Sequence, residues 1–376
     1  MKYNVSIMQV LLTEESKTYK KQVEDFISAN LKDINLKSLW QNLYKKSFIK
    51  KENKFLENIL LTEALCKFNP GIGLFLLTHF TCIEIIKNFA SDSLKEKYLD
   101  KLISGEDISC FSITEPNAGS DVSMIETSAK KENNKWIING HKIWASNASI
   151  SDIIVIFVQA KSEETIHELS QRKSGISCII IPSNSKEVEI LANTPKLGVE
   201  ITPSNEVFIK DLSVNSENQI GNLGDGMKIA LSTITLGRIY CAAQAVGLLS
   251  GILEEAIKHS TKRNQFGKSI SDYQAIKWYI ADMTKDLDAA KLLLYKAAWA
   301  KENNPAELNK LSSMAKYFCT SVAQKHSANA VQIFGGAGLI KDSYVANAYR
   351  DSKVLEIYEG TNEIQKVVLT RELNLV

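Results

Sequence analysis

The stretch MKIALSTITLGRIYCAAQAVGLLSGILEEAIKHS, residues 227–260, decides the fold class of the C-terminal part of the chain. Apolar residues recur along it at positions i, i+3 and i+4, the spacing that places them on one face of an α-helix. No proline lies between residues 204 and 304, so nothing there interrupts a long helix. The stretch therefore predicts one long helix.

Further helical stretches follow this one. AIKWYIADMTKDLDAAKLLLYKAAWAKEN (275–303) is ended by Asn303, Asn304 and Pro305, and ELNKLSSMAKYFCTSVAQKHSANAVQIFG comes next. We expect two shorter helices on either side of Glu359. Long helices joined by short connections predict an up-down bundle. We assign residues 217–376 to this C-terminal four-helix-bundle domain.

The preceding region, residues 108–216, has a different character. It contains short β-branched runs such as IIVIFVQA and GISCIIIPS, bounded by Ser, Gly, Pro and Asp. Within KWIINGHKIWASNA, the pair Asn139-Gly140 joins two apolar runs and predicts a hairpin turn. These features predict a middle β-sandwich or barrel domain.

Residues 1–107 are predicted to be helical. FLENILLTEALCKF and GIGLFLLTHFTCIEIIKNFA are apolar enough for their helices to be well buried. The expected fold class is therefore α+β, with an N-terminal all-α domain (1–107), a β domain (108–216) and a helical bundle (217–376).

Composition excludes several classes of function. The 376-residue chain has 45 Lys and Arg against 43 Asp and Glu, a net charge of +2 that gives no electrostatic basis for nucleic-acid binding. Its six cysteines form no CxxC pair and its five histidines are dispersed, so neither a disulfide frame nor a metal site is expected. The N-terminus lacks a signal-peptide h-region and no apolar run reaches membrane-spanning length, so we expect a cytoplasmic protein.

One carboxylate stands in an unusual place. In IYEGTNEIQ (357–365), Glu359 lies at an apolar helix end beside Gly360. Gly360 permits a left-handed turn, and Thr361 or Asn362 can cap the next helix. From these residues alone, Glu359 is either a plain capped-turn residue or a base that is held where its charge matters.

Five short motifs follow one another along the chain: CFSITEPNAGSD, INGHKIWASNA, RNQFGKSISDYQAI, VQIFGGAG and IYEGTNEIQ. In this order they resemble the acyl-CoA dehydrogenase flavoproteins, and the resemblance covers nearly the whole chain. CFSITEPNAGSD (110–121) resembles the family's first flavin signature, and INGHKIWASNA (138–148) resembles its second. RNQFGKSISDYQAI (263–276), VQIFGGAG (331–338) and IYEGTNEIQ fit its C-terminal bundle. Any one of these strings alone is a weak signal, but five in order are a strong one.

The resemblance implies α,β-dehydrogenation of an acyl thioester. A base removes the α-proton, and the β-hydrogen leaves as hydride to FAD. Glu359 is the implied base, and its own backbone N–H helps to polarise the thioester carbonyl. Part of the family carries the base one residue before an Arg on the long helix. That position is Gly237 here, which cannot take a proton, and Arg238 follows it. Ser120, Arg238 and Gly360 are the implied substrate-binding residues.

The resemblance also implies the residues that bind FAD. Thr114 and Trp144 touch the flavin ring, Ser120 contacts the pyrophosphate or the pantetheine arm, and Ser146 keeps the hydroxyl of a family Thr. Arg263 and Phe266 reach the FAD of a neighbouring subunit, which implies a homo-oligomer, a dimer or, as is usual, a tetramer. The remaining implied cofactor residues are Gln274, Gln332, Phe334, Gly335, Gly336, Thr361 and Glu363.

Two departures from the family pattern bear on the substrate. LYKKSFIKKENK replaces a Tyr-Gly-Gly-type loop in a region expected to shape substrate entry, and Glu200 lies where an Arg often follows the Leu-Gly pair. An acyl-carrier-protein thioester therefore stays open beside an acyl-CoA. Electrons are expected to leave to an electron-transferring flavoprotein or another acceptor. The alternatives are a flavin-dependent oxidase or monooxygenase of the same fold, or a non-catalytic binding relative.

Overall fold

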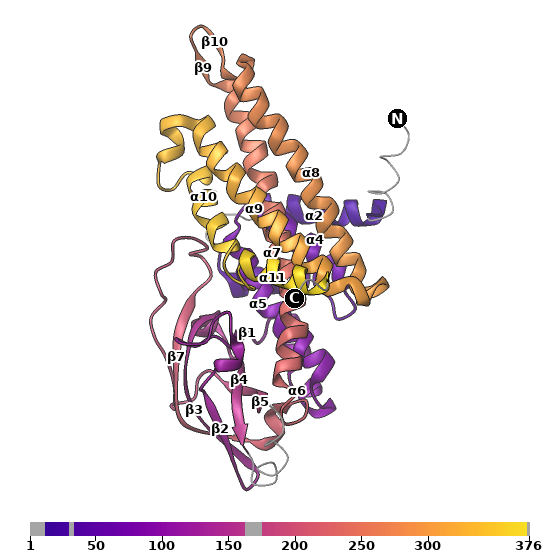
Figure 1. Cartoon of the computed structure of the whole chain (residues 1–376), viewed down its shortest axis with the longest axis vertical. Coiled ribbons are helices and arrows are strands. Elements are labelled where there is room, and N and C mark those ends of the chain that lie inside the picture. The colour runs from indigo at the N-terminus through magenta and orange to yellow at the C-terminus, as the bar shows by residue number, and fades with distance from the viewer. Residues whose placement is uncertain (1–11, 30–33, 162–174, 374–376) are drawn as a thin grey trace.

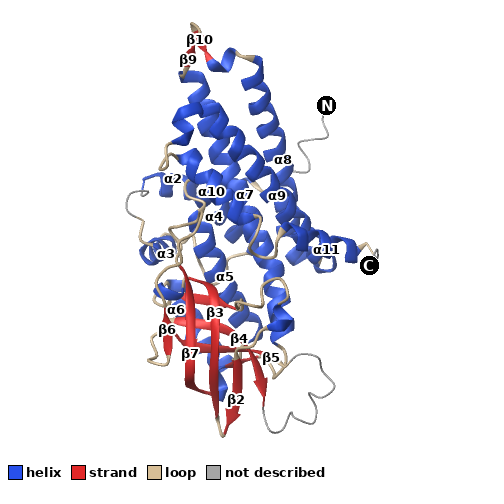
Figure 2. Ribbon diagram, turned by 60° about the vertical axis from the view of Figure 1, so that its left-hand side comes forward, coloured by secondary structure: helices blue, strands red, loops and turns tan. Residues whose placement is uncertain are grey.

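The computed structural model describes residues 12–29, 34–161 and 175–373. A twisted sheet lies at one end of an elongated molecule, and long helices extend away from it to the other end (Figures 1 and 2). Among the helices that precede the sheet in sequence, α5 (Gly71–Phe89) contacts both the sheet and the bundle, so the cores of the three parts adjoin.

The N-terminal part of the described chain is helical, as predicted. Its helices are α2 (Glu14–Ala29), α3 (Leu36–Lys45), α4 (Phe55–Cys66), α5 (Gly71–Phe89) and α6 (Asp92–Ser104). Asn35 and Ser91 cap the first turns of α3 and α6 with their side chains, and Gly105 ends α6 in a left-handed conformation. Nearly every residue of α4 and α5 is buried, which confirms the expectation from their apolar composition.

The β region forms one mixed sheet in the order β6-β7-β3-β2-β4-β5-β8, and β1 and β2 both run parallel to β4 along one of its edges. Residues of β4 alternate between two cores: Val155 and Phe157 face the helical core, whereas Ile154 and Ile156 face the core of the sheet. The strands are β1 (Ser109–Ser112), β2 (Ser128–Glu132), β3 (Lys135–Ser146), β4 (Ile153–Lys161), β5 (Ile176–Pro182), β6 (Val188–Ile190), β7 (Ser204–Asn215) and β8 (Gln219–Ile220).

The hairpin predicted at Asn139-Gly140 is wrong. Strand β3 runs straight through these residues, with a bulge between Ile138 and Gly140 in its pairing with β7. The Asn139 side chain pairs with Asp211 of β7, by accepting from its backbone N–H (2.8 Å) and donating to its carboxylate (3.1 Å). A Cβ on Gly140 would lie 2.3 Å from the Thr127 hydroxyl, so the glycine serves close packing and not a turn.

The C-terminal part is a helical bundle built around α7, which packs against α4, α5, α8, α9 and α10. The prediction of one long helix there is confirmed. The helices are α7 (Gly226–Lys262), α8 (Gln274–Asn303), α9 (Leu308–Phe334), α10 (Tyr344–Leu355) and α11 (Asn362–Glu372). A small hairpin, β9 (Asn264–Gln265) and β10 (Lys268–Ser269), caps the bundle end that lies farthest from the sheet (Figure 1). The predicted helical, β and helical order is therefore confirmed.

The expectation that no apolar run reaches membrane-spanning length is wrong for two of these helices. By length and composition, α5 and α7 are apolar enough to cross a membrane. The most apolar windows of the two helices are 78% and 83% buried inside the fold. They are core helices, which need the same apolar composition as a membrane span because other protein segments surround them.

Candidate active site

A cavity of about 570 Å³ opens where the sheet, α5 and the segment between α10 and α11 meet. Leu74, Leu77 and Thr78 of α5 line one wall, and Ile234 of α7 lies in another. The remaining lining residues are Phe111, Ile113, Thr114, Gly119, Ser120, Val122, Trp144, Ser146, Pro195, Lys196, Leu197, Ser204, Lys353, Val354, Ile357, Tyr358, Glu359, Gly360 and Thr361.

Glu359 lies in the cavity wall, in the segment that joins α10 to α11. Its backbone is in the left-handed region (φ 57°), which a non-glycine residue enters only when its surroundings hold it there. Gln365 provides that support, because its amide donates to the carbonyl oxygens of Glu359 (3.1 Å) and Gly360 (2.8 Å). Gly360 is left-handed too (φ 80°), and Thr361 caps α11 through the N–H of Ile364.

Backbone donors in this left-handed segment are left without protein acceptors. Within the described chain, the N–H groups of Glu359, Gly360 and Thr361 donate to no protein acceptor, and all three residues line the cavity. Successive free N–H groups of this kind can bind a carbonyl oxygen or an anion.

Burial raises the pKa of Glu359 to about 7, and the positive charges of Arg238 and Lys316 counteract part of this rise. Burial dominates because desolvation disfavours the charged carboxylate more than the two cations favour it. A carboxyl group with a pKa near neutrality can accept a proton from a weak acid and release it again at physiological pH.

Gly237 of α7 lies directly against this carboxylate. A Cβ built on Gly237 would lie 2.1 Å from Oε2 of Glu359 and 2.6 Å from its Cδ. No residue larger than glycine fits there while Glu359 keeps its position, because real atoms do not approach so closely. An acidic side chain at position 237 and the carboxylate of Glu359 would therefore compete for the same space.

Arg238, the next residue of α7, is buried. Its Nη1 donates to Oδ1 of Asn309 (2.9 Å) and to the hydroxyl of Ser313 (3.1 Å), while its buried Nε has no partner within the described chain. Arg238 therefore acts on Glu359 through its charge, and it makes no direct ion pair with Glu359 among the described contacts.

The sheet supplies the opposite wall of the cavity. Trp144 has a left-handed backbone (φ 55°) at a bulge in β3 between Lys142 and Ala145, which turns its indole outward, and it is 53% exposed. The hydroxyls of Ser146 and Ser204 lie 3.2 Å apart beside it. Together with Thr114 and Ser120, these residues give an aromatic surface edged by hydrogen-bonding groups, which fits a flat ring system with polar edges such as a flavin.

The structure divides the predicted cofactor residues into two groups. Thr114, Ser120, Trp144, Ser146 and Thr361 line the cavity, while the exposed Glu363 follows in α11. The other group lies at the far end of the bundle, near β9 and β10, where Phe334 stacks on His259 with ring centroids 4.1 Å apart. Its members are Arg263, Phe266, Gln274, Gln332, Phe334, Gly335 and Gly336. One chain does not bring the two groups together.

Several cavity residues were missed from the sequence. The segment with Pro195, Lys196 and Leu197 forms part of the rim, and it is anchored where the N–H of Val199 donates to Asp351 of α10 (2.6 Å). The sequence predicts only core positions for Leu74, Leu77 and Ile234, because helical periodicity does not distinguish a face that packs in the core from a face that lines a cavity. Gln365 lies within a quoted motif, but its distance in sequence from Glu359 gave no sign of its contact.

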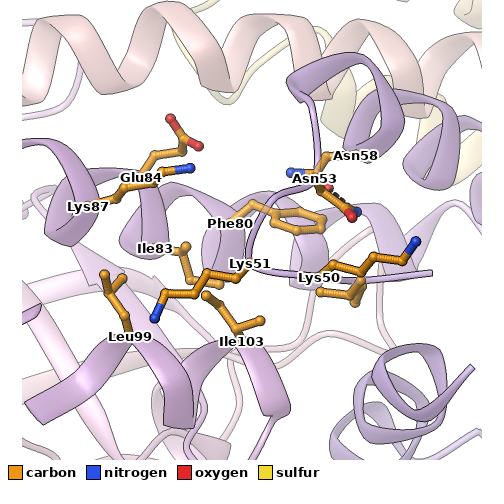
Figure 3. A pocket seen from close by; sticks show the side chains of 11 residues that line it. Lys50, Lys51, Asn53, Asn58, Phe80, Ile83, Glu84, Lys87, Leu99 and Ile103 are labelled. Carbon is orange, nitrogen blue, oxygen red and sulfur yellow. Dashed lines mark hydrogen bonds between the residues drawn. The ribbon is translucent and has the colours of Figure 1, made fainter. Parts of the chain in front are cut away.

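A second hollow lies elsewhere (Figure 3). It measures about 70 Å³ and lies between α5, α6 and the segment that holds Ile49, Lys50, Lys51 and Asn53. It has about one eighth of the volume of the larger cavity, about 70 against about 570 Å³, and it offers far less room for an acyl thioester. None of residues 43–54 is among the residues that line the larger cavity, and an effect of this segment on substrate entry stays a prediction.

The order of helical, sheet and helical parts, with a carboxylate facing a cavity at their junction, defines a class of three-part flavoenzymes. The acyl-CoA dehydrogenase N-terminal, middle and C-terminal domain models match residues 45–106, 110–212 and 224–374. The chain therefore belongs to the acyl-CoA dehydrogenase family. It is an FAD-dependent oxidoreductase that acts on the CH–CH bond of acyl thioesters.

Individual relatives support this assignment. The chain is 34% identical to the short-chain specific acyl-CoA dehydrogenase of Clostridium acetobutylicum, over 94% of this chain and 91% of that protein. It is 38% identical to caffeyl-CoA reductase-Etf complex subunit CarC of Acetobacterium woodii, over 73% and 70%. The butyryl-CoA dehydrogenase structure from Megasphaera elsdenii superposes with a TM-score of 0.88 at 32% identity, covering 96% of this chain and 99% of that one.

Proposed function

We propose that the cavity binds a short acyl thioester and that Glu359 is the base that removes its α-proton. The observation that carries this proposal is the Glu359 carboxyl itself, which faces the cavity with a pKa raised to about 7. A thioester α-proton is weakly acidic, so the base must be poorly solvated and the developing negative charge must be stabilised.

The free N–H groups at residues 359–361 support the second requirement. They line the cavity on the same segment as the base, where they can donate to the thioester oxygen as negative charge develops on it. Ser120 and Arg238 are proposed to contribute to substrate binding, Ser120 from the sheet side and Arg238 through its charge. Gly360 contributes its N–H, and its left-handed backbone presents the group.

Thr114, Ser120, Trp144 and Ser146 are the residues proposed to hold the flavin in the cavity, with Thr361 and Glu363 nearby. Bound FAD supplies the chemistry of accepting the β-hydrogen as hydride. Because Arg263, Phe266 and the other far-end residues cannot reach the cavity of their own chain, we propose that they serve the cofactor of a neighbouring subunit in a homo-oligomer. Phe266 is 94% exposed and has a left-handed backbone. Such exposure of a large aromatic side chain supports its contact with a neighbouring subunit.

We propose that Gln244 limits the length of the acyl chain, because it is bonded to a residue of the cavity wall. Tyr358, which lines the cavity, donates its hydroxyl to Gln244, and Gln244 donates in turn to the Pro70 carbonyl. Gln244 is fully buried, and a Cβ on Gly73 of α5 would lie 2.7 Å from it. This chain of contacts fills the space between α5 and α7 behind Tyr358.

Replacing Gln244 with Ala is expected to open that space. The ratio of kcat/KM for octanoyl-CoA to that for butyryl-CoA should rise by roughly tenfold or more, since each accommodated methylene contributes about 1 kcal/mol or more. Gln244→Met conserves the volume and is the matched control, with an unchanged ratio expected. An equal ratio in the Ala and Met variants would contradict a role for Gln244 in chain length.

We further propose that the chain acts in the cytoplasm and passes electrons to a flavoprotein partner. The name of the Acetobacterium woodii relative describes a subunit of an Etf complex, which supports an acceptor of that kind. The same relative is called a reductase, so the partner's potential would set the direction of the reaction in the cell.

The test is anaerobic bleaching of the purified yellow protein by a panel of thioesters. Butyryl-CoA and other short acyl-CoAs are expected to bleach the flavin, with octanoyl-CoA much slower, and the matching acyl-carrier proteins decide between the two carriers. Protein that binds no flavin would favour a binding protein. Reoxidation by oxygen with repeated turnover would favour an oxidase.

A further inference from the structure

One buried side chain, that of Lys316, binds both ends of the segment that carries Glu359. The ends of this segment, Glu356 and Asn362, are joined by a bond from the N–H of Asn362 to the carbonyl of Glu356 (3.0 Å). Lys316 of α9 donates from Nζ to that same carbonyl (2.8 Å) and to Oδ1 of Asn362 (2.8 Å). A single ammonium therefore bridges the two ends.

The surrounding contacts tie this arrangement to α9. The hydroxyl of Thr320 donates to Oδ1 of Asn362 (3.0 Å), and Nδ2 of Asn362 donates to the hydroxyl of Ser321 (3.2 Å). With Lys316, three side chains of one helix hold Asn362. The base thus sits on a short segment whose position relative to α9 is fixed by hydrogen bonds at its ends.

Lys316 is unusual among the lysines of this protein. It is fully buried, yet no carboxylate lies within 4 Å of its Nζ in the described chain, so its two hydrogen bonds go to neutral oxygens. By contrast, Lys142, which is also fully buried, is paired with Glu115 at 2.6 Å. A buried charge without an ion-pair partner is costly. Burial lowers the pKa of Lys316, whereas its electrostatic interactions with Cys241 and with the acids Glu359, Glu356 and Glu363 raise it. The field of its ammonium group therefore reaches those acids.

We propose that Lys316 is a positioning residue for the base: it holds the segment that carries Glu359 against α9, and its charge favours the ionised form of that carboxylate. This inference rests on the proposed role of Glu359. Lys316 itself does not line the cavity and touches no reacting atom.

The electrostatic part follows from the groups that surround Glu359. Burial raises the pKa of this carboxyl, and Arg238 on α7 and Lys316 on α9 act in the opposite direction. The other titratable neighbours, Tyr358 on the same segment and Cys241 on α7, have pKa values raised mainly by burial and are neutral at physiological pH. Arg238 and Lys316 are therefore the cations that keep the base available near neutrality.

The pH dependence of kcat/KM separates an effect of charge from a purely structural one. The active form of the base is the carboxylate, so kcat/KM falls tenfold per pH unit below the pKa of Glu359 and is flat above it. Removing a nearby positive charge raises that pKa and moves the acid limb to higher pH. The loss is then largest at low pH and shrinks at high pH. A purely structural defect would lower the rate at every pH.

The central variant is Lys316→Met, whose unbranched side chain is one atom shorter and lacks the charge and the donors. Its acid limb of kcat/KM is expected to move up by roughly one pH unit from a wild-type limb near pH 7. A second readout does not depend on hydride transfer. Exchange of the α-hydrogens of a 3-thiaacyl-CoA with D2O, measured by NMR, should show the same shift, because this analogue has sulfur in place of the β-carbon.

Two further variants make the result decisive. Lys316→Arg keeps the charge and should keep the wild-type limb even where the rate falls. Lys301→Met removes a half-buried lysine that pairs with Glu84 (2.7 Å), and it should lose stability without moving the limb. If Lys316→Met yields no folded protein, Lys316→Gln against Lys316→Arg makes the same comparison.

A limb that stays at the wild-type pH in the neutral variants of Lys316 overturns the inference. That outcome leaves the role of Glu359 intact as long as Glu359→Gln abolishes exchange of the α-hydrogens. Full exchange activity in Glu359→Gln would instead remove the proposed function itself.

Discussion

Replacing Glu359 with Gln is expected to lower kcat for dehydrogenation by roughly 100- to 10,000-fold or more while FAD stays bound, because the variant loses the only proposed proton acceptor. The amide has nearly the same shape as the carboxyl group, so the left-handed backbone and its support by Gln365 are retained. The cavity keeps its aromatic and hydroxyl wall. The protein should therefore remain yellow and bind thioesters, yet fail to react with them.

Stopped-flow bleaching of the flavin by butyryl-CoA measures this loss directly. The matched control is Glu356→Gln in the same segment, since Glu356 pairs with the exposed Lys353 (2.8 Å) and lies outside the cavity lining. The control should react at a rate close to that of the wild type. If Glu359→Gln reacts as fast as its control, another group removes the proton and the proposed mechanism is wrong.

The second large effect is expected from Gly237→Ala. The new Cβ would overlap the Glu359 carboxylate, whose Oε2 lies 2.1 Å from the position that the Cβ would take. Either the carboxylate or α7 must move, and a displacement of about 1 Å in a catalytic group can lower the rate about 100-fold. The helix itself should not suffer, because alanine favours a helix interior over glycine by about 1 kcal/mol. We expect a stable, flavin-bound protein with at least that loss in kcat.

A double-mutant cycle separates this clash from a general disturbance. Glu359→Asp shortens the side chain and withdraws the carboxylate from the space beside residue 237. The cost of Gly237→Ala should therefore be much smaller in the Glu359→Asp background than in the wild type, a coupling of about 1 kcal/mol or more between residues in contact. Additive losses would indicate that Gly237 matters for some reason other than the space it leaves for the base.

Much of the fold was predictable because its signals are local. Helical spacing in residues 227–260, proline-free sequence and the stop at Asn303, Asn304 and Pro305 correctly predicted α7 and the end of α8. Alternation between two cores explains why β4 reads as a continuous apolar run. The wrong prediction of a hairpin at Asn139-Gly140 also came from relying on a local signal. A turn motif states what the backbone can adopt, and the packing of Gly140 against Thr127 decided that it stays extended.

The candidate site was predictable in part. Motif order indicated Glu359, and an apolar helix end beside glycine marked it as a carboxylate worth attention. Its left-handed φ angle, its support by Gln365 and the raised pKa depend on residues that other segments bring to it. The cofactor residues near Phe266 remain predictions, because one chain places them at the far end of the bundle from the cavity.

Local sequence was enough to predict the helical or strand class of the three regions and the family, and it indicated Glu359 as the candidate base, since periodicity and short motifs are properties of neighbouring residues. Three relations appear only in the folded chain: Gly237 and Glu359 share one space, Tyr358 donates to Gln244, and Lys316 bridges residues 356 and 362. The physical reason is that desolvation, steric exclusion and charge act through space. These effects join residues that are far apart in sequence. Lys316 and Asn362 are separated by 46 positions, Gln244 and Tyr358 by 114, and Gly237 and Glu359 by 122.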